Sequence, residues 1–335
     1  MSQFRFKSFL TIIAICGILL IAITACDGNP TNAPVTTSEP STLEPTIADP
    51  TSMPARLVLV DQQGQVEEPL TTLLGDFASV NSLLFETRAT MDGDFTGVTI
   101  AVVLEADDSL NSIASSNPQT QFVGIGTTII AADSNLSVIL NKPEDLAFMA
   151  GQLTTLVSKD WRSGGLLSAT GATIEVISEA FRNGGSYMCG TCYPAYPPYN
   201  SSPIYQDVSG KSGSEMAVDV EVLSVNKVNV TFVSRAADVS EVIKAFKMAE
   251  IPMIGENANS EEAGRYAAIL GFDEGTALEE MLPKLLAGQG GQEAVSRVVL
   301  LVVNDETLVT PARQEVFNTA AEALQGGWII PLSVR

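Results

Sequence analysis

The sequence predicts an α/β fold made of two doubly wound lobes, each built around a parallel sheet. Short apolar strands alternate with amphipathic helices from Arg56 to Leu324, which is the pattern of parallel α/β proteins. The segment Val98–Leu104 (VTIAVVL) is nearly all apolar, as a strand buried on both faces must be. The alternation supplies more strands than one sheet comfortably holds, so two lobes are favoured over the alternative, a (β/α)₈ barrel.

The strands are predicted from short apolar runs that end at polar or glycine residues. We expect them at Arg56–Asp61, Ser82–Arg88, Val98–Leu104, Gln121–Ile125, Asn135–Leu140, Gly164–Ser168, Met216–Leu223, Val228–Val233, Ile251–Gly255, Arg265–Gly271 and Arg297–Val303.

The helices are predicted from apolar residues at helical spacing and from helix-start residues. Pro143 opens the clearest one, with Glu144 and Asp145 near the positive end of the helix dipole. In the same helix, the pair Ala150-Gly151 permits close packing against a neighbour. We expect helices at Val66–Val80, Asp108–Ser116, Pro143–Leu156, Thr173–Arg182, Ser240–Ala249, Ala277–Ala287 and Thr310–Leu324, and a long Tyr/Pro/Ser loop at Gly184–Val208.

The N-terminus, residues 1–25, has the three parts of a lipoprotein signal peptide. Arg5 and Lys7 give a positive start, and the apolar run Phe9–Ile23 is shorter than the roughly 20 residues a membrane-spanning helix needs. The string ITAC that ends at Cys26 resembles the bacterial lipobox, which implies lipid modification of that cysteine. An uncleaved anchor helix with a chance cysteine is the alternative.

Residues 26–54 are expected to join the lipidated Cys26 to the folded domain, residues 55–335, as a flexible tether. They are rich in Thr, Pro and Ser, and prolines deny the backbone N–H groups that helices and sheets need. The tether can reach several tens of Å from the membrane.

Composition excludes several classes of function. The formal net charge of −21 argues against nucleic acid or an anionic membrane surface as a partner, so the membrane is reached through the lipid anchor only. The sequence has no histidine, which excludes Ser-His-Asp and Cys-His catalysis and metal sites built on imidazole. We therefore expect a binding protein with no catalytic residue, no metal and no cofactor.

The string Cys-Gly-Thr-Cys places Cys189 and Cys192 close together in a segment rich in Gly, Tyr and Pro. In an oxidising, exported setting such a pair indicates a small structural disulfide. A redox CxxC motif is the alternative, but that motif usually opens a helix, and these residues are expected in a loop.

Six segments carry a resemblance to a known family: residues 118–125, 135–138, 142–151, 164–167, 181–185 and 251–255. Together they resemble the basic membrane protein family of nucleoside-binding lipoproteins. The resemblance implies a type I periplasmic-binding-protein fold, with a ligand cleft between two lobes. This sequence departs from the family where Gln62-Gln63-Gly64-Gln65 follows Asp61 without an aromatic residue, and where Glu256-Asn257 replaces an aspartate.

Ligands of open α/β sheets bind outside the carboxyl ends of the strands. Polar residues at these ends are therefore the candidate ligand contacts, although each could equally be a solvated surface residue and Arg235 could pair with Asp238 or Glu241. Tyr187 and its neighbouring tyrosines could stack on a ligand, or could simply pack down a disulfide-bonded loop. The candidates are Asp61, Gln63, Glu105, Thr127, Gly171, Tyr187, Arg235 and Asn257, with Glu256 beside the last of them.

These observations predict a substrate-binding lipoprotein of an ABC-type importer, anchored at the extracytoplasmic side of the cell membrane. Its expected partners are a small polar solute, such as a nucleoside, and a membrane permease. The alternative is a sensory or scaffolding envelope lipoprotein that keeps the binding fold without transport, and uses the Tyr/Pro loop to contact another protein.

Overall fold

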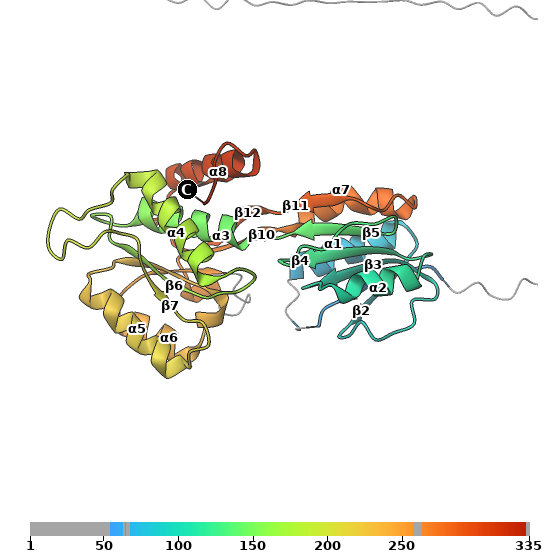
Figure 1. Cartoon of the computed structure of the whole chain (residues 1–335), viewed down its shortest axis with the longest axis horizontal. Helices are drawn as coiled ribbons and strands as arrows, with labels where there is room; N and C mark the ends of the chain where they lie inside the picture. The colour runs from blue at the N-terminus through green and yellow to red at the C-terminus, as the bar shows by residue number, and fades with distance from the viewer. Residues whose placement is uncertain (1–53, 63, 65–67, 257–262, 333–335) are drawn as a thin grey trace, which may run out of the picture. The chain divides into compact units, whose positions relative to one another are not determined.

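The computed structural model describes residues 54–62, 64, 68–256 and 263–332, all of which belong to one compact unit, Ser52–Arg335. The predicted signal peptide, Cys26 and the tether lie outside the described residues, as do Gln63 and Asn257. The described residues form two six-stranded sheets with helices on both faces of each (Figure 1).

In the first sheet every neighbouring pair of strands is parallel, and the order is β11-β5-β4-β3-β1-β2. Two helices, α1 (Glu68–Val80) and α7 (Glu274–Leu286), bury their apolar sides on one face, and α2 (Ser109–Ser116) packs on the other. The strands are β1 (Arg56–Val60), β2 (Leu84–Arg88), β3 (Val98–Leu104), β4 (Gln121–Gly126), β5 (Leu136–Leu140) and β11 (Glu293–Val295).

The second sheet has the order β12-β10-β9-β8-β6-β7, and only β12 runs antiparallel to its neighbour. One face is covered by α3 (Pro143–Val157), α4 (Ile174–Cys189) and α8 (Pro311–Gln325), and the other by α5 (Gly213–Val225) and α6 (Ser240–Ala249) (Figure 1). The strands are β6 (Ser163–Leu167), β7 (Ile204–Asp207), β8 (Val230–Val233), β9 (Met253–Glu256), β10 (Ala268–Asp273) and β12 (Arg297–Val303). The predicted α/β fold with two doubly wound sheets is confirmed.

The chain passes between the two sheets three times within the described residues. Asn141 and Lys142 connect β5 to α3, Asp273 ends β10 directly before α7, and Ser296 lies between β11 and β12. The predicted alternation of strands and helices therefore does not divide the chain into two consecutive halves, because each lobe is assembled from separate stretches of sequence.

Helices α3 and α4 pack unusually closely, and two glycines make this possible. A Cβ atom on Gly151 would lie 1.9 Å from the carbonyl oxygen of Phe181, and one on Gly184 would lie 1.9 Å from that of Phe148. No side chain fits at either position, because backbone rather than a movable side chain occupies the space. The close packing expected at Ala150-Gly151 is confirmed.

The predicted strand Met216–Leu223 is wrong, because these residues belong to helix α5. The helix begins with a capping box. The backbone N–H of Ser212 donates a hydrogen bond of 2.8 Å to Oε2 of Glu215, and the side chain of Ser212 accepts one from the backbone N–H of Glu215. Met216, Val220 and Leu223 are buried at helical spacing, whereas Val218 and Val222 are exposed. The sequence Val218-Asp219-Val220-Glu221-Val222 alternates apolar and acidic residues, which is the two-residue period typical of a strand.

The predicted loop Gly184–Val208 is also wrong at both ends. Helix α4 continues to Cys189, and residues 204–207 form β7. Gly184 and Gly185 do not end the helix, because they are the positions where it meets α3 and Pro203. The short strand β11 was not predicted, and β10 begins three residues later than expected, after a short 3₁₀ turn at Ala263–Arg265.

Candidate functional site

Polar residues at the carboxyl ends of strands from both sheets line a cavity of about 530 Å³. Asp61, Glu105 and Thr127 follow β1, β3 and β4 of the first sheet. Arg235 follows β8 of the second sheet, and Glu256 ends β9. The structure therefore brings together four of the predicted site residues, Asp61, Glu105, Thr127 and Arg235, in the arrangement that open α/β sheets use to hold ligands.

Gly171 lies directly against this lining, in the loop after β6. Its φ is +72°, a backbone conformation that side chains rarely adopt, and an added Cβ would lie 2.6 Å from Cβ of Thr127. The same added atom would be 2.9 Å from Cγ of Pro143. Glycine is thus required for the close approach of this loop to Thr127, and its neighbour Thr170 lines the cavity itself.

Glu256 and Arg235 interact through the backbone. The N–H of Arg235 donates a hydrogen bond of 2.9 Å to Oε2 of Glu256. Burial raises the pKa of Glu256 above its ordinary value, while this hydrogen bond and the Arg235 charge oppose the rise and the Glu105 charge adds to it. The Glu105 charge therefore acts on Glu256 although the two residues lie at the ends of strands in different sheets.

Glu105 has a left-handed backbone conformation, with φ of +49°. For a residue with a side chain this conformation costs about 1 kcal/mol or more relative to the right-handed regions. The strained residue is the one that presents its carboxylate to the cavity directly after the buried strand β3.

Three carboxylate or amide residues of the lining were not predicted: Asn141, Asp273 and Glu274. Nδ2 of Asn141 donates a hydrogen bond of 2.6 Å to Oε1 of Glu274, and only 5% of Asn141 is exposed. Its Oδ1 atom is buried and accepts no hydrogen bond from the described residues. Asn141 directly follows the expected strand Asn135–Leu140, so the rule that ligands bind at the carboxyl ends of strands could have found it. The local sequence does not show that the chain passes from one sheet to the other at this residue.

The rest of the lining is mostly apolar. Leu70 and Leu73 come from α1, Leu146 from α3, and Phe272 is the aromatic residue among the described lining. The complete described lining is Asp61, Pro69, Leu70, Leu73, Leu104, Glu105, Ile125, Thr127, Asn141, Pro143, Leu146, Thr170, Arg235, Ala236, Glu256, Phe272, Asp273, Glu274, Gly275 and Leu301.

A more open groove of about 820 Å³ lies between α1 and α7 and shares Pro69, Leu73, Asp273 and Gly275 with the cavity. Apart from Asp273, its lining comes from the two helices rather than from strand ends. The smaller cavity is therefore the candidate ligand site.

Tyr187 does not line the cavity. It lies on α4, where its ring is 5.8 Å from that of Phe148, and 52% of it is exposed. Gln63 and Asn257 lie outside the described residues, so their predicted role at the site stays a prediction.

Cys192 and three tyrosines, Tyr193, Tyr196 and Tyr199, belong to the segment from Gly190 to Pro203, here called the Tyr/Pro loop. Cys189 is the last residue of α4, and the structure joins its sulfur to that of Cys192, with 5.1 Å between the Cα atoms. This geometry differs from a redox CxxC motif at a helix start, because the pair lies at the end of its helix.

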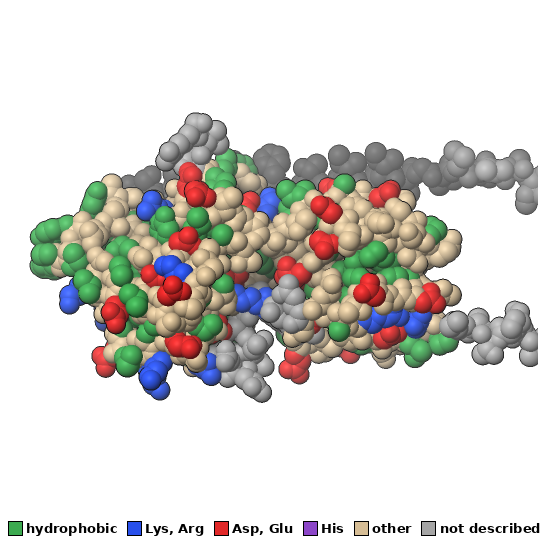
Figure 2. Space-filling model, turned by 60° about the horizontal axis from the view of Figure 1, so that its bottom comes forward, with side chains coloured by type: hydrophobic (Ala, Val, Ile, Leu, Met, Phe, Trp, Pro, Cys, Tyr) green, Lys and Arg blue, Asp and Glu red, His purple; other side chains and the backbone are tan. Residues whose placement is uncertain are grey.

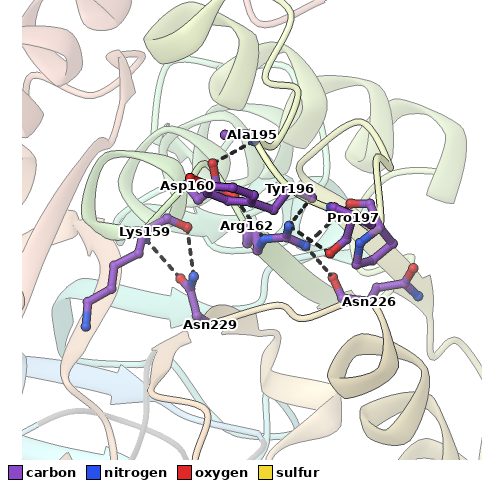
Figure 3. Close-up of polar contacts among 9 residues, drawn as sticks. Lys159, Asp160, Arg162, Ala195, Tyr196, Pro197, Asn226 and Asn229 are labelled. Carbon is purple, nitrogen blue, oxygen red and sulfur yellow. Dashed lines mark hydrogen bonds and ion pairs between the residues drawn. The ribbon is translucent and has the colours of Figure 1, made fainter.

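The Tyr/Pro loop is held down by the buried guanidinium of Arg162 (Figure 3). It donates to the carbonyl oxygens of Tyr196, Pro197 and Pro198 in the loop. It also donates to the carbonyl oxygen of Asn226 and pairs with Asp160, whose other oxygen accepts the backbone N–H of Ala195 at 2.8 Å. One arginine and one aspartate thus bind four backbone groups of the loop, and the loop in turn supplies acceptors to the buried guanidinium.

Three tyrosines of the loop nevertheless point to solvent. Tyr193 is 60% exposed, Tyr196 73% and Tyr199 63%. Hydrophobic side chains, among which tyrosine is coloured, gather at the left edge of the face in Figure 2, the end at which this loop lies in Figure 1. Acidic side chains are scattered over the rest of that face (Figure 2).

Among the described residues, no three His, Cys, Asp or Glu side chains are grouped closely enough to hold a metal ion. None of the helices in the described part of the chain is both long and apolar enough to cross a membrane.

The sequence matches no family profile and no curated protein. Solved structures do resemble it: an ABC transporter system solute-binding protein from Conexibacter woesei superposes with a TM-score of 0.61 at 12% identity, over 82% of this chain and 98% of that one. A second solute-binding protein of this kind, from Aeropyrum pernix, has a TM-score of 0.57 at 11% identity, over 83% and 93%. A transcriptional activator of the comK gene from Bacillus halodurans has a TM-score of 0.58 at 14% identity, over 83% and 99%.

The chain has a type I periplasmic-binding-protein-like fold. At these identities the likeness establishes the fold and not the ligand, and the fold is shared by transport proteins and a transcription regulator. The narrower resemblance to nucleoside-binding lipoproteins stays a prediction.

Proposed function

We propose that this chain is the solute-binding component of an ABC-type importer, held at the extracytoplasmic face of the membrane by a lipid on Cys26. The single observation that carries the proposal is the cavity, because it collects strand-end polar residues from both sheets around a space sized for a small molecule. The likeness of the fold to ABC solute-binding proteins and the signal-like N-terminus support it.

The ligand is a small polar solute, and the sequence resemblance suggested a nucleoside. Ribose hydroxyls suit the carboxylates of Asp61 and Glu105, and Phe272 offers an aromatic ring. A nucleoside therefore belongs in the set of solutes that tests the proposal, beside sugars and amines.

A thermal-shift screen tests solute binding directly. The full chain, purified in detergent, is heated with nucleosides, sugars, amino acids and amines, and a bound solute raises the melting temperature. Thr170→Trp serves as the control, because Thr170 is exposed, lines the cavity and can carry a ring that fills it. The proposal is wrong if no small solute shifts the melting temperature of a well-folded protein.

The anchor is tested separately, by metabolic labelling with palmitate. We expect label on the wild-type chain and none on Cys26→Ser, whereas Cys16→Ser, in the segment to be removed, should keep it. Label that survives in Cys26→Ser would contradict the lipid anchor and leave solute binding untouched.

A second candidate function is an envelope scaffold that contacts another protein. The exposed Tyr193, Tyr196 and Tyr199 favour it, because tyrosine is enriched at protein interfaces. A photo-crosslinking residue at position 196 in intact cells would distinguish the two. An adduct with a protein other than a permease, combined with no solute binding, would favour the scaffold.

A further inference from the structure

Two side chains of the cavity lining carry opposite charges that no contact within the described part of the chain uses. The guanidinium of Arg235 and the carboxylate of Glu105 both line the cavity, and neither makes a hydrogen bond or an ion pair with a described residue. Arg235 follows β8 of the second sheet, whereas Glu105 follows β3 of the first. The cavity therefore presents one available charge of each sign, each from a different sheet.

The carboxylates of Asp61, Asp273 and Glu274, which also line the cavity, are engaged within the protein. Asp273 caps helix α7, because its two oxygens accept hydrogen bonds from the backbone N–H and the hydroxyl of Thr276 at 3.1 and 2.7 Å. Glu274 accepts the hydrogen bond of Asn141, and Asp61 also interacts within the protein. These three carboxylates serve the fold, and we do not count them as ligand contacts.

Glu256 does not occupy the guanidinium of Arg235. Oε2 of Glu256 accepts its hydrogen bond from the backbone N–H of Arg235, at 2.9 Å, and not from the side chain. Burial raises the pKa of Glu256, which favours the neutral form of this carboxyl group, while the Arg235 charge opposes the rise. The N–H donors of the guanidinium therefore remain for a ligand.

The two available charges call for complementary groups on one molecule. A guanidinium matches a carboxylate in geometry, since two parallel N–H groups donate to two oxygens. The carboxylate of Glu105 only accepts hydrogen bonds, and an ammonium group offers three N–H donors and no acceptor. The side chains of Leu70, Leu146 and Phe272 line the same cavity and suit a hydrocarbon body.

We infer that the solute is a small zwitterion, an organic molecule that carries one carboxylate and one ammonium group on a partly apolar body, as amino acids do. Arg235 binds the carboxylate and Glu105 binds the ammonium, so the ligand contacts both lobes. This inference rests on the proposed solute-binding function and names its substrate class. A ligand with one charge, or with none, leaves a charged side chain uncompensated where the ligand displaces water, which is costly.

Matched sets of probes test the inference by calorimetric titration of the full chain in detergent. Leucine is compared with 3-methylbutylammonium and 4-methylpentanoate, and phenylalanine with 2-phenylethylammonium and 3-phenylpropanoate. A wider spacing of the charges is covered by 4-aminobutanoate, compared with propylammonium and butanoate. Adenosine and glucose serve as uncharged probes. We expect at least one zwitterion to bind about tenfold or more tightly than each of its two singly charged analogues.

The outcomes separate this inference from the proposed function. If any other solute binds while no zwitterion does, the zwitterion inference is overturned and solute binding stands. The same holds if, in every set, a singly charged analogue binds as tightly as its zwitterion. If no probe and no other small solute binds, both are overturned.

Two charge-removing variants assign the contacts, because each should abolish one comparison and keep the other. Arg235→Met should weaken the zwitterion about tenfold and remove its advantage over the ammonium analogue, while its advantage over the carboxylate analogue remains. Glu105→Gln should do the reverse. Arg235→Met keeps the backbone N–H that binds Glu256, so this contact of the fold is retained.

Matched controls remove the same charges from exposed positions outside the described lining. They are Lys244→Met on α6 and Glu280→Gln on α7, and neither should change the affinity of any probe. If Arg235→Met or Glu105→Gln weakens the zwitterion no more than its control does, the effect is one of net charge and the assignment to this cavity is overturned.

Discussion

Nδ2 of Asn141 donates a hydrogen bond of 2.6 Å to Oε1 of Glu274, and this contact joins two of the places where the chain passes between the sheets. Asn141 follows β5 on the way to α3, and Glu274 opens α7 directly after β10. Both residues line the cavity. The connections that assemble the two lobes therefore also form part of the candidate ligand site.

Asn141→Ala should destabilise the fold by about 1–3 kcal/mol, because it removes a buried side chain together with the hydrogen bond that this side chain donates to the Glu274 carboxylate. Urea unfolding followed by circular dichroism measures the change. Asn318→Ala is the control, since Asn318 is exposed on α8, and its stability should stay within about 0.5 kcal/mol of wild type. Equal stability of Asn141→Ala and wild type would show that the contact contributes nothing.

Gly151→Ala and Gly184→Ala should each destabilise the protein by about 3 kcal/mol or prevent folding, because the added methyl group meets backbone at 1.9 Å. The helices α3 and α4 must separate to admit it. Gly275→Ala provides the comparison: it lies in α7, where the nearest atom to an added Cβ is 3.6 Å away, and alanine favours the helix. Similar melting temperatures for all three variants would contradict the close packing.

Asp145 should make stability fall as pH rises. Burial raises the pKa of Asp145 from 3.8 to about 6, with the Lys142 charge opposing the rise. The folded protein binds this proton more tightly than the unfolded chain does. The stability that this tighter binding supplies is fully present below pH 3.8, where the carboxyl group is protonated in both the folded and the unfolded protein, and it is lost as pH rises through about 6. Because the group is only partly buried, we expect Asp145→Asn to be more stable than wild type by about 1 kcal/mol at pH 7.5.

The test of Asp145 is urea unfolding of the two proteins at pH 7.5 and at the lowest pH at which both remain folded. The advantage of Asp145→Asn should shrink at the lower pH. A difference that is the same at both pH values would mean that titration of this carboxyl group is not its cause.

Arg162→Met should release the Tyr/Pro loop, because the carbonyl oxygens of Tyr196, Pro197 and Pro198 lose their donor at once. Limited proteolysis should then cut within residues 190–203 at least several-fold faster than in wild type. Lys159→Met is the matched control: its side chain is exposed and extends away from the loop in Figure 3, and its backbone pairs with Asn229. Unchanged cleavage in Arg162→Met would show that the loop is held by other contacts.

Most of the fold could be predicted from the sequence, because buried strands of a parallel sheet leave a strong local signal. Val98–Leu104, Ser240–Ala249 and Arg297–Val303 have the predicted bounds. Helix α5 was mistaken for a strand because exposed Val218 and Val222 alternate with acidic residues, and only the capping box at Ser212 indicated a helix. The glycines after Arg182 were read as a helix end because their role is in tertiary packing, which the local pattern does not show.

The site could be predicted only where it depends on strand ends. Asp61, Glu105, Thr127 and Arg235 follow strands directly, and the cavity contains all four. Asp273 and Glu274 were not predicted because the expected strand ends at Gly271, whereas β10 ends at Asp273. In addition, the residues at which the chain passes between the sheets depend on the strand order, which the local sequence does not reveal. Tyrosine clustering suggested ligand stacking by Tyr187, but that clustering marks a separate surface loop.

Titration of the full chain with small solutes, in parallel with Thr170→Trp, tests the central claim most directly. Our account predicts that a small solute binds the wild-type chain and loses its affinity in Thr170→Trp. Binding that is equally strong in Thr170→Trp, or no binding by any solute to the well-folded wild-type chain, would contradict it.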